Sequence, residues 1–170
     1  MEGGAVFDAS GNYRYSLWRS WNQQAARVVF VMLNPSTADA TANDATIRRC
    51  LGFAHLWGYG SLEVVNLFAF RSSDPQTLRR VADPIGQECD RYILAAVQRA
   101  ERVIVAWGNG GSWQRRDQTV LALLQHDTSL YCLGQNQSGQ PSHPLYLKRT
   151  VQVAPYPGYC GVEQSSAALG

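Results

Sequence analysis

Three polar side chains that can bind and orient a ligand stand at or after the ends of apolar segments. Asn34 follows the run at residues 28–33, Asn66 lies near the end of a second run, and His143 comes shortly after a fourth. An asparagine amide has one donor side and one acceptor side, and a neutral imidazole has one donor and one acceptor nitrogen. Such groups suit the recognition of a polar ring and the stabilisation of an oxyanion, but an asparagine cannot act as a general base near neutral pH.

The apolar runs predict the elements that position these side chains. Four continuous runs are typical of buried strands and lie at residues 28–33, 62–67, 103–108 and 130–134. Helices are expected between them, from a cap at Thr41–Asp44 to Gly58, from Asp83 to about Arg99, and from about Ser112 to His126. This alternation favours a three-layer α/β sandwich around a central, mainly parallel four-stranded sheet. The alternating segment at residues 13–19 adds an N-terminal edge strand or hairpin arm.

The carboxyl ends of parallel strands meet at one edge of a sheet, where ligands of open α/β sheets bind. Four short segments are expected at that edge: Asn34-Pro35-Ser36-Thr37, Asn66, Trp107-Gly108 and His143-Pro144. The sequence therefore predicts one site built from segments that lie far apart along the chain.

Composition limits the architecture and the cellular setting. With 170 residues, 45% of them hydrophobic and 16% charged, the chain suits one domain, which we expect at residues 1–155, followed by a flexible tail at residues 156–170. The four cysteines are far apart, so free thiols in a reducing, cytoplasmic compartment are expected. The sequence lacks an apolar run long enough to span a bilayer and a basic-then-apolar start, so no membrane association is expected.

Other motifs and charge narrow the function classes. The sequence contains no Walker A lysine loop, no G-x-G-x-x-G and no G-x-S-x-G, which removes the usual grounds for phosphoryl transfer, dinucleotide redox chemistry and serine hydrolysis. It also lacks Cys/His metal spacing, so we expect no metal and no cofactor. A net charge of +2 and a pI near 8.4 neither indicate nor exclude binding to nucleic acid.

Four of these motifs occur in an order that resembles the uracil-DNA glycosylase superfamily. Leu33-Asn34-Pro35-Ser36 resembles the first motif of its mismatch-specific uracil/thymine branch, and His143-Pro144 resembles the second motif, His-Pro-Ser. Asn66 resembles a base-reading asparagine at a strand end, and Trp107-Gly108 resembles a Leu-Trp-Gly strand. More closely, residues 13–147 are similar to the bacterial family called domain of unknown function 1643. Leucine replaces the serine of the second motif, and the first motif lacks the acidic residue of the most active branches.

The resemblance implies an N-glycosidase that hydrolyses the bond between a pyrimidine-like base and deoxyribose in DNA. Asn34 would hold a water molecule against the sugar, His143 would donate to the base oxygen as negative charge develops, and Asn66 would read the base edge. Further substrate-binding residues would be Pro35, Ser36, Thr37, Trp107 and Gly108, with Phe68 or Phe70 as the stacking surface. Residues inserted into or contacting DNA would be Leu145, Tyr146, Lys148 and Arg149.

Plainer interpretations remain open beside this one. Asn-Pro is a common turn, Asn66 can cap a turn, and the Arg48-Arg49 and Arg115-Arg116 pairs can belong to solvated helix faces. Two other functions are also compatible with the same residues. One is an enzyme of the same fold that acts on a free nucleoside or nucleotide, and the other is a module that binds a nucleic-acid base without cleaving it.

Overall fold

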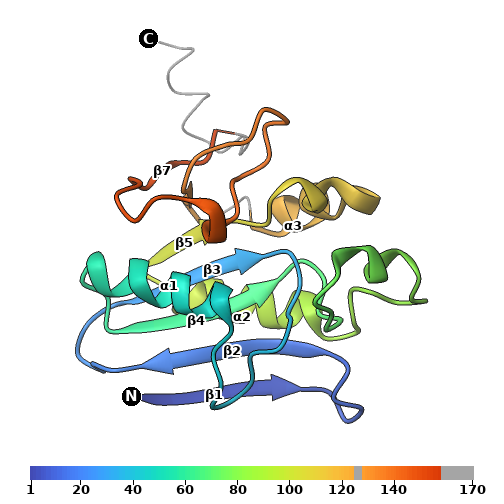
Figure 1. Cartoon of the computed structure of the whole chain (residues 1–170), viewed down its shortest axis with the longest axis horizontal. Coiled ribbons are helices and arrows are strands. Elements are labelled where there is room, and N and C mark those ends of the chain that lie inside the picture. The colour runs from blue at the N-terminus through green and yellow to red at the C-terminus, as the bar shows by residue number, and fades with distance from the viewer. Residues whose placement is uncertain (125–127, 158–170) are drawn as a thin grey trace.

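The computed structural model describes residues 1–124 and 128–157 as a mixed α/β structure built on one sheet of seven strands (Figure 1). The strands are β1 (Glu2–Phe7), β2 (Arg14–Ser20), β3 (Arg27–Met32), β4 (Ser61–Asn66), β5 (Arg102–Val105), β6 (Leu130–Cys132) and β7 (Ala154–Pro155). Their order across the sheet is β1-β2-β4-β3-β5-β6-β7. The four strands predicted from the apolar runs are β3, β4, β5 and β6, and all their mutual pairings are parallel.

Three antiparallel strands extend the four parallel ones: β2 is the hairpin arm predicted at residues 13–19, whereas β1 and β7 were not predicted. β1 and β2 form a hairpin whose second arm pairs with β4, and β7 pairs with β6 at the opposite side of the sheet. The edge of the sheet is therefore β1, and β2 lies inside it. Glu2–Phe7 contains two glycines and only three apolar residues, so it has no strand signal beyond what pairing with β2 supplies.

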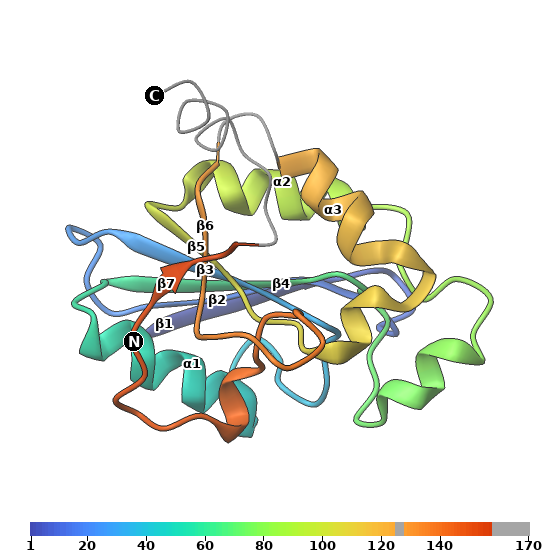
Figure 2. The same cartoon turned by 90° about the horizontal axis from the view of Figure 1, so that it is seen from above.

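Helices cover both faces of the sheet, as Figure 2 shows, with α1 on one side and α2 and α3 on the other. Their bounds are Ala45–Leu56 for α1, Cys89–Arg99 for α2 and Arg116–Leu124 for α3. Strand alternation divides the core accordingly. On β3, Phe30 and Met32 pack toward α1, and Val29 and Val31 pack toward α2 and α3.

Two predicted helices begin later than expected. Asp83 Oδ1 accepts hydrogen bonds from the backbone N–H groups of Ile85 and Gly86, and Gly86 has φ of 91°, so a turn precedes α2. The expected helix from Ser112 is a 3-10 helix, η2 (Asn109–Arg115), that ends in a kink before α3 begins. Helix α1 begins as predicted near Asp44, whose Oδ1 accepts from the backbone N–H of Ile47 at 2.9 Å.

The segment after β7 is also packed. Tyr156 is buried, and its backbone N–H donates to Leu130 O at 2.9 Å, so the folded part continues through this residue. Residues 158–170 of the expected tail lie outside the described part of the chain. Among the described helices, none has the length and apolar character needed to cross a membrane.

Candidate functional site

The carboxyl ends of β4, β3 and β5 lie side by side, and hydrogen bonds continue beyond the strands. Leu67 N–H donates to Met32 O at 2.9 Å, which keeps the chain after β4 beside the end of β3. Ala106 N–H donates to Val31 O, which keeps the chain after β5 beside β3. Two residues later, Gly108 N–H donates to Pro141 O at 2.9 Å. These bonds bring the segments that contain Asn34, Asn66, Gly108 and His143 to one edge of the sheet.

His143 lies against Gly108 at this edge. A Cβ atom built on Gly108 would lie 3.7 Å from the Cβ of His143, and Gly108 has φ of 74°, which favours glycine. The chain therefore turns sharply after β5 and passes close to the Cβ atom of His143.

Asn66 occupies the last position of β4, and its side chain is buried. It pairs in register with Met32, which belongs to the core beneath α1, so its amide points toward the α1 face of the sheet. Among the described residues, neither Nδ2 nor Oδ1 of Asn66 has a hydrogen-bond partner. A buried amide without partners is destabilising, and unpaired groups of this kind are uncommon in folded proteins. This amide is therefore a candidate for ligand recognition.

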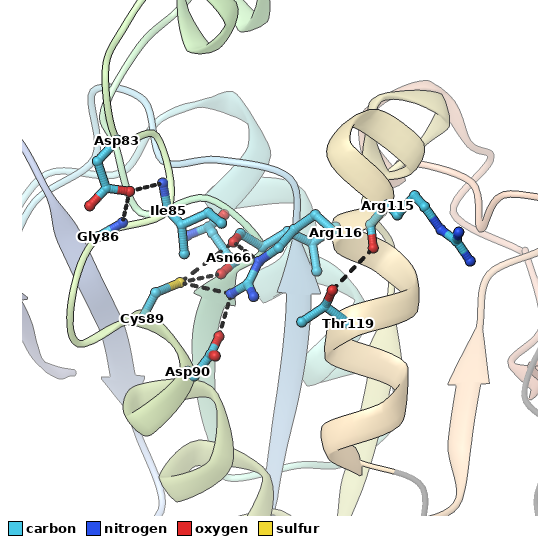
Figure 3. Close-up of polar contacts among 10 residues, drawn as sticks. Asn66, Asp83, Ile85, Gly86, Cys89, Asp90, Arg115, Arg116 and Thr119 are labelled. Atoms are coloured by element: carbon cyan, nitrogen blue, oxygen red, sulfur yellow. Dashed lines mark hydrogen bonds and ion pairs between the residues drawn. The ribbon is translucent and has the colours of Figure 1, made fainter.

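The backbone of Asn66 is held from the opposite face of the sheet. The thiol of Cys89 donates to the carbonyl oxygens of Asn66 and Leu67, with Sγ–O distances of 3.2 and 3.5 Å. Arg116 Nε donates to Leu67 O at 2.7 Å, and its Nη2 pairs with Asp90 at 2.5 Å. Figure 3 shows the Arg116 side chain extending from the start of α3 toward Cys89 and Asp90 on α2. The helices on one face thus position an amide that faces the other.

One property of this support, the burial of Arg116, differs from the sequence prediction, whereas the protonated thiol of Cys89 agrees with it. Arg116 is 3% exposed rather than part of a solvated helix face, because its guanidinium binds a backbone carbonyl and a carboxylate. Burial raises the pKa of Cys89 to about 11, against the opposing effect of the nearby guanidinium. Cys89 is therefore a thiol near neutral pH, and the two carbonyl oxygens share its single S–H proton.

His143 is held as a neutral imidazole with a defined tautomer. Its Nδ1 accepts the backbone N–H of Leu145 at 3.2 Å at the start of the 3-10 helix η3 (Pro144–Tyr146). Burial lowers the pKa of His143, and the carboxylate of Asp44 opposes this shift. Because Nδ1 is the acceptor, the proton of the neutral ring is on Nε2, which can donate to a ligand. Asp44 caps α1, so His143 lies on the same side of the sheet as the Asn66 amide.

Asn34 connects the loop after β3 to the segment after β4. Its Nδ2 donates to Pro35 O at 3.0 Å and to Ser72 O at 2.8 Å, which orients the amide. Asn34 Oδ1 accepts no hydrogen bond from the described residues, and it is not fully buried. Ser36 Oγ shares a 3.0 Å hydrogen bond with Ser73 Oγ, Pro35 is buried, and Thr37 is exposed.

The predicted aromatic residues do not join these side chains. Phe68 and Trp107 are buried in the core beneath α2 and α3, on the face opposite the Asn66 amide. The ring centroids of Phe68 and Trp113 lie 5.4 Å apart. Trp107 Nε1 donates a hydrogen bond to Gln140 Oε1, with 2.8 Å between the two atoms. Phe70 packs edge-on against Tyr13 at 5.5 Å. Alternation along β4 would place Phe68 on the same face as Asn66, but the strand ends at Asn66 and the next three residues all join the core beneath α2 and α3.

The residues predicted to contact DNA lie in and after η3. Tyr146 is 87% exposed, with its ring centroid 6.3 Å from that of His143, whereas Leu145 is half-buried. Lys148 and Arg149 are exposed. This segment therefore places one exposed aromatic ring beside the imidazole, followed along the chain by two exposed cations.

Sequence reasoning missed Arg14, which lies on β2 near α1. The guanidinium is buried, Nη1 donates to Ala38 O at 3.0 Å, and Nε has no partner among the described residues. Burial lowers the pKa of Arg14 to about 10, and Asp44 opposes the shift. Its place within an alternating strand indicated a solvent-facing residue, so the sequence held no signal that its guanidinium is buried.

The donor set favours an organic ligand bound by hydrogen bonds. In the described ranges, three or more His, Cys, Asp or Glu side chains nowhere gather in a way that could hold a metal ion. The available groups are two amides, a neutral imidazole and a guanidinium. Amides and imidazole match the mixed donor and acceptor pattern of a polar heterocycle.

Comparison with known proteins yields one family. Neither the curated proteins nor the solved structures include a match to this chain. Residues 14–145 match the family described as "Protein of unknown function (DUF1643)", which covers most of the chain and nearly the whole expected stretch of 13–147. The match includes Asn34, Asn66 and His143. The chain therefore belongs to the DUF1643 family.

Proposed function

We propose that this protein hydrolyses the N-glycosidic bond of a pyrimidine-like base in DNA, and that its fold is a three-layer arrangement of the uracil-DNA glycosylase type. The main support is the buried amide of Asn66, whose donor and acceptor both lack partners among the described residues. The neutral imidazole of His143 lies at the same edge and on the same face. The parallel β4-β3-β5-β6 core between α1 and the α2/α3 pair supports the fold assignment.

Base recognition would use both edges of the Asn66 amide. Oδ1 accepts the N3–H of a uracil-like ring, while Nδ2 donates to the adjacent carbonyl oxygen. These two bonds satisfy the groups that are unpaired in the protein alone, so ligand binding removes a destabilising feature. The bonds from Cys89 and Arg116 to the backbone keep the amide in place before the base arrives.

Cleavage would proceed by departure of the base before full attack by water. The C1′–N1 bond breaks, its electron pair stays on the base, and His143 Nε2–H donates to the oxygen on which negative charge develops. Asn34 Oδ1 accepts a hydrogen bond from a water molecule, which then adds to C1′ and releases a proton to solvent. Because an amide does not deprotonate water at neutral pH, we expect a modest rate.

A second candidate is an enzyme that acts on free nucleosides or nucleotides. Arg14, Arg19 and Arg116 are buried, where they bind backbone carbonyls and cannot contact a DNA backbone. Cations that neutralise phosphates supply most non-specific affinity for DNA. The net charge of the chain is only +2, and the three buried arginines add no positive charge to the surface that DNA could contact. This favours a small substrate.

The decisive assay presents the protein with single- and double-stranded oligonucleotides that carry uracil, mismatched thymine, hypoxanthine or hydroxymethyluracil. Alkali-labile abasic sites are expected with at least one substrate, and Asn34→Ala and His143→Ala should each reduce their formation at least tenfold. His55→Ala is the matched control, because His55 is exposed on α1 and stacks on Trp21 at 4.0 Å.

The other outcomes select between the remaining functions. The absence of abasic sites on every substrate contradicts DNA base hydrolysis. Release of free base from nucleosides or nucleotides supports the second candidate. Salt-sensitive retention of DNA without product supports a base-binding module instead.

A further inference from the structure

The outer surface of α1 contains a groove that the proposed hydrolysis does not use. A cavity of about 300 Å³ lies between one stripe of α1 and the segment after η3, which run beside each other in Figure 2. The residues that line it are Ala45, Arg48, Arg49, Gly52, Phe53, Leu56 and Arg149. The α1 residues are spaced by three or four positions, which places them on one side of the helix.

The groove is positively charged. It is lined by three arginines and by no described Asp or Glu side chain, and none of the three belongs to an ion pair within the described ranges. Arg48 Nη1 donates to Asn43 O at 2.7 Å, and Arg49 Nε donates to Pro144 O at 3.4 Å. Most of their N–H groups, and those of Arg149, remain available. Guanidinium groups match the geometry of phosphate oxygens.

The apolar part of the groove gives room for more than a phosphate. Leu56 lines it with a large apolar side chain that is 66% exposed. Phe53 forms the floor, because it is 2% exposed and the Arg49 guanidinium lies 5.3 Å from the centre of its ring. Gly52 stands in the interior of α1, where glycine weakens a helix relative to alanine. A Cβ at this position would meet nothing within 4 Å, so close packing does not require glycine. The missing side chain keeps the middle of the groove open.

We propose that this groove binds the phosphate of a nucleotide, with the arginines on the phosphate and the exposed Leu56 side chain against the sugar or base. A cavity of about 300 Å³ is at the lower end of the range for small-molecule sites. The bond from Arg49 to Pro144 O joins the groove to the residue after His143, so a nucleotide bound here lies beside the candidate site. This proposal does not depend on base hydrolysis.

Calorimetric titration of the full chain at low salt tests it directly. We expect thymidine 5′-monophosphate to bind at least tenfold more tightly than thymidine and than inorganic phosphate. The affinity of a short single-stranded thymidine oligonucleotide is then compared with that of the monophosphate. Tighter binding of the oligonucleotide indicates a phosphate within a strand, and tighter binding of the monophosphate indicates a free nucleotide. Equal affinity for the monophosphate and thymidine, or no binding of either phosphate compound, overturns the proposal.

Variants locate the binding site. Arg149→Gln removes an exposed guanidinium without a hydrogen bond to described residues and should weaken monophosphate binding about tenfold. Gly52→Glu places a carboxylate in the groove and should abolish binding. The matched controls are Arg80→Gln, an equal charge change outside the groove, and Gln118→Glu, an added carboxylate on the exposed side of α3. Equal loss of affinity in the variants and their controls overturns the assignment.

One further pair separates the groove from the proposed active site. His143→Ala should remove cleavage of the oligonucleotides while binding of the monophosphate stays measurable. Arg149→Gln should weaken binding of the monophosphate whether or not His143 is also replaced. Binding that disappears with His143→Ala but persists in Gly52→Glu would place the nucleotide in the Asn66 site and contradict a separate groove.

Discussion

Replacement of Asn66 by leucine should stabilise the protein while removing the proposed recognition of a base. The Asn66 side chain is 2% exposed, and neither amide atom has a partner among the described residues. Leaving such a group buried and unpaired costs about 1–3 kcal/mol. Leucine has a similar shape and places methyl groups where the amide atoms were, beside Met32 and the core beneath α1.

We therefore expect Asn66→Leu to raise the free energy of unfolding by about 1–3 kcal/mol. For a chain of this size, a gain of about 2 kcal/mol corresponds to a rise in Tm of about 4–8 °C. Urea unfolding followed by tryptophan fluorescence measures the change as a higher midpoint at constant m-value. The same variant should lose abasic-site formation on the best oligonucleotide.

Asn34→Leu is the matched control, since it makes the same replacement at the neighbouring strand end. In the unchanged protein, Asn34 Nδ2 donates hydrogen bonds to Pro35 O and Ser72 O. The leucine variant loses both, so its free energy of unfolding should fall by about 1–2 kcal/mol. If Asn66→Leu instead lowers the free energy of unfolding by more than about 1 kcal/mol, the amide is satisfied in the folded protein. The argument that it awaits a ligand then fails.

Three further predictions concern the support of the site, the groove and pH. Arg116→Ala should lower the free energy of unfolding by about 1–3 kcal/mol, because Leu67 O and Asp90 Oδ1 each lose a hydrogen-bond donor. An unchanged midpoint of urea unfolding would contradict this prediction. Gly52→Ala should raise thermal stability by up to about 1 kcal/mol in a calorimetric scan, and a loss would mean that the added methyl clashes. The folded-state pKa of His143 lies below its ordinary value of 6.5, so the unfolded chain binds more protons and stability falls as pH drops from about 6.5 toward the folded-state value. Urea midpoints at pH 8 and pH 5 should therefore differ less in His143→Gln than in the unchanged protein.

Several features of the fold followed from the sequence because they depend on local composition. Long apolar runs are buried wherever they fold, so the parallel β3, β4, β5 and β6 strands were predictable, as was the order in which helices separate them. Polar residues at the ends of those runs had to reach one edge of the sheet. Asn34, Asn66 and His143 were therefore identified as candidates without any knowledge of contacts.

Tertiary structure decided the features that depend on distant partners. Glu2–Phe7 is a strand because β2 supplies its hydrogen bonds, and Arg14 and Arg116 are buried because carbonyls from separate loops and strands accept their protons. Strand alternation ends with β4 at Asn66, so Phe68 lies in the opposite core, away from the Asn66 amide. Sequence alone identified an asparagine at a strand end, and only the packed structure revealed that its amide is buried without a partner. Hydrogen-bond satisfaction is a property of all the surrounding segments together, and no single segment encodes it.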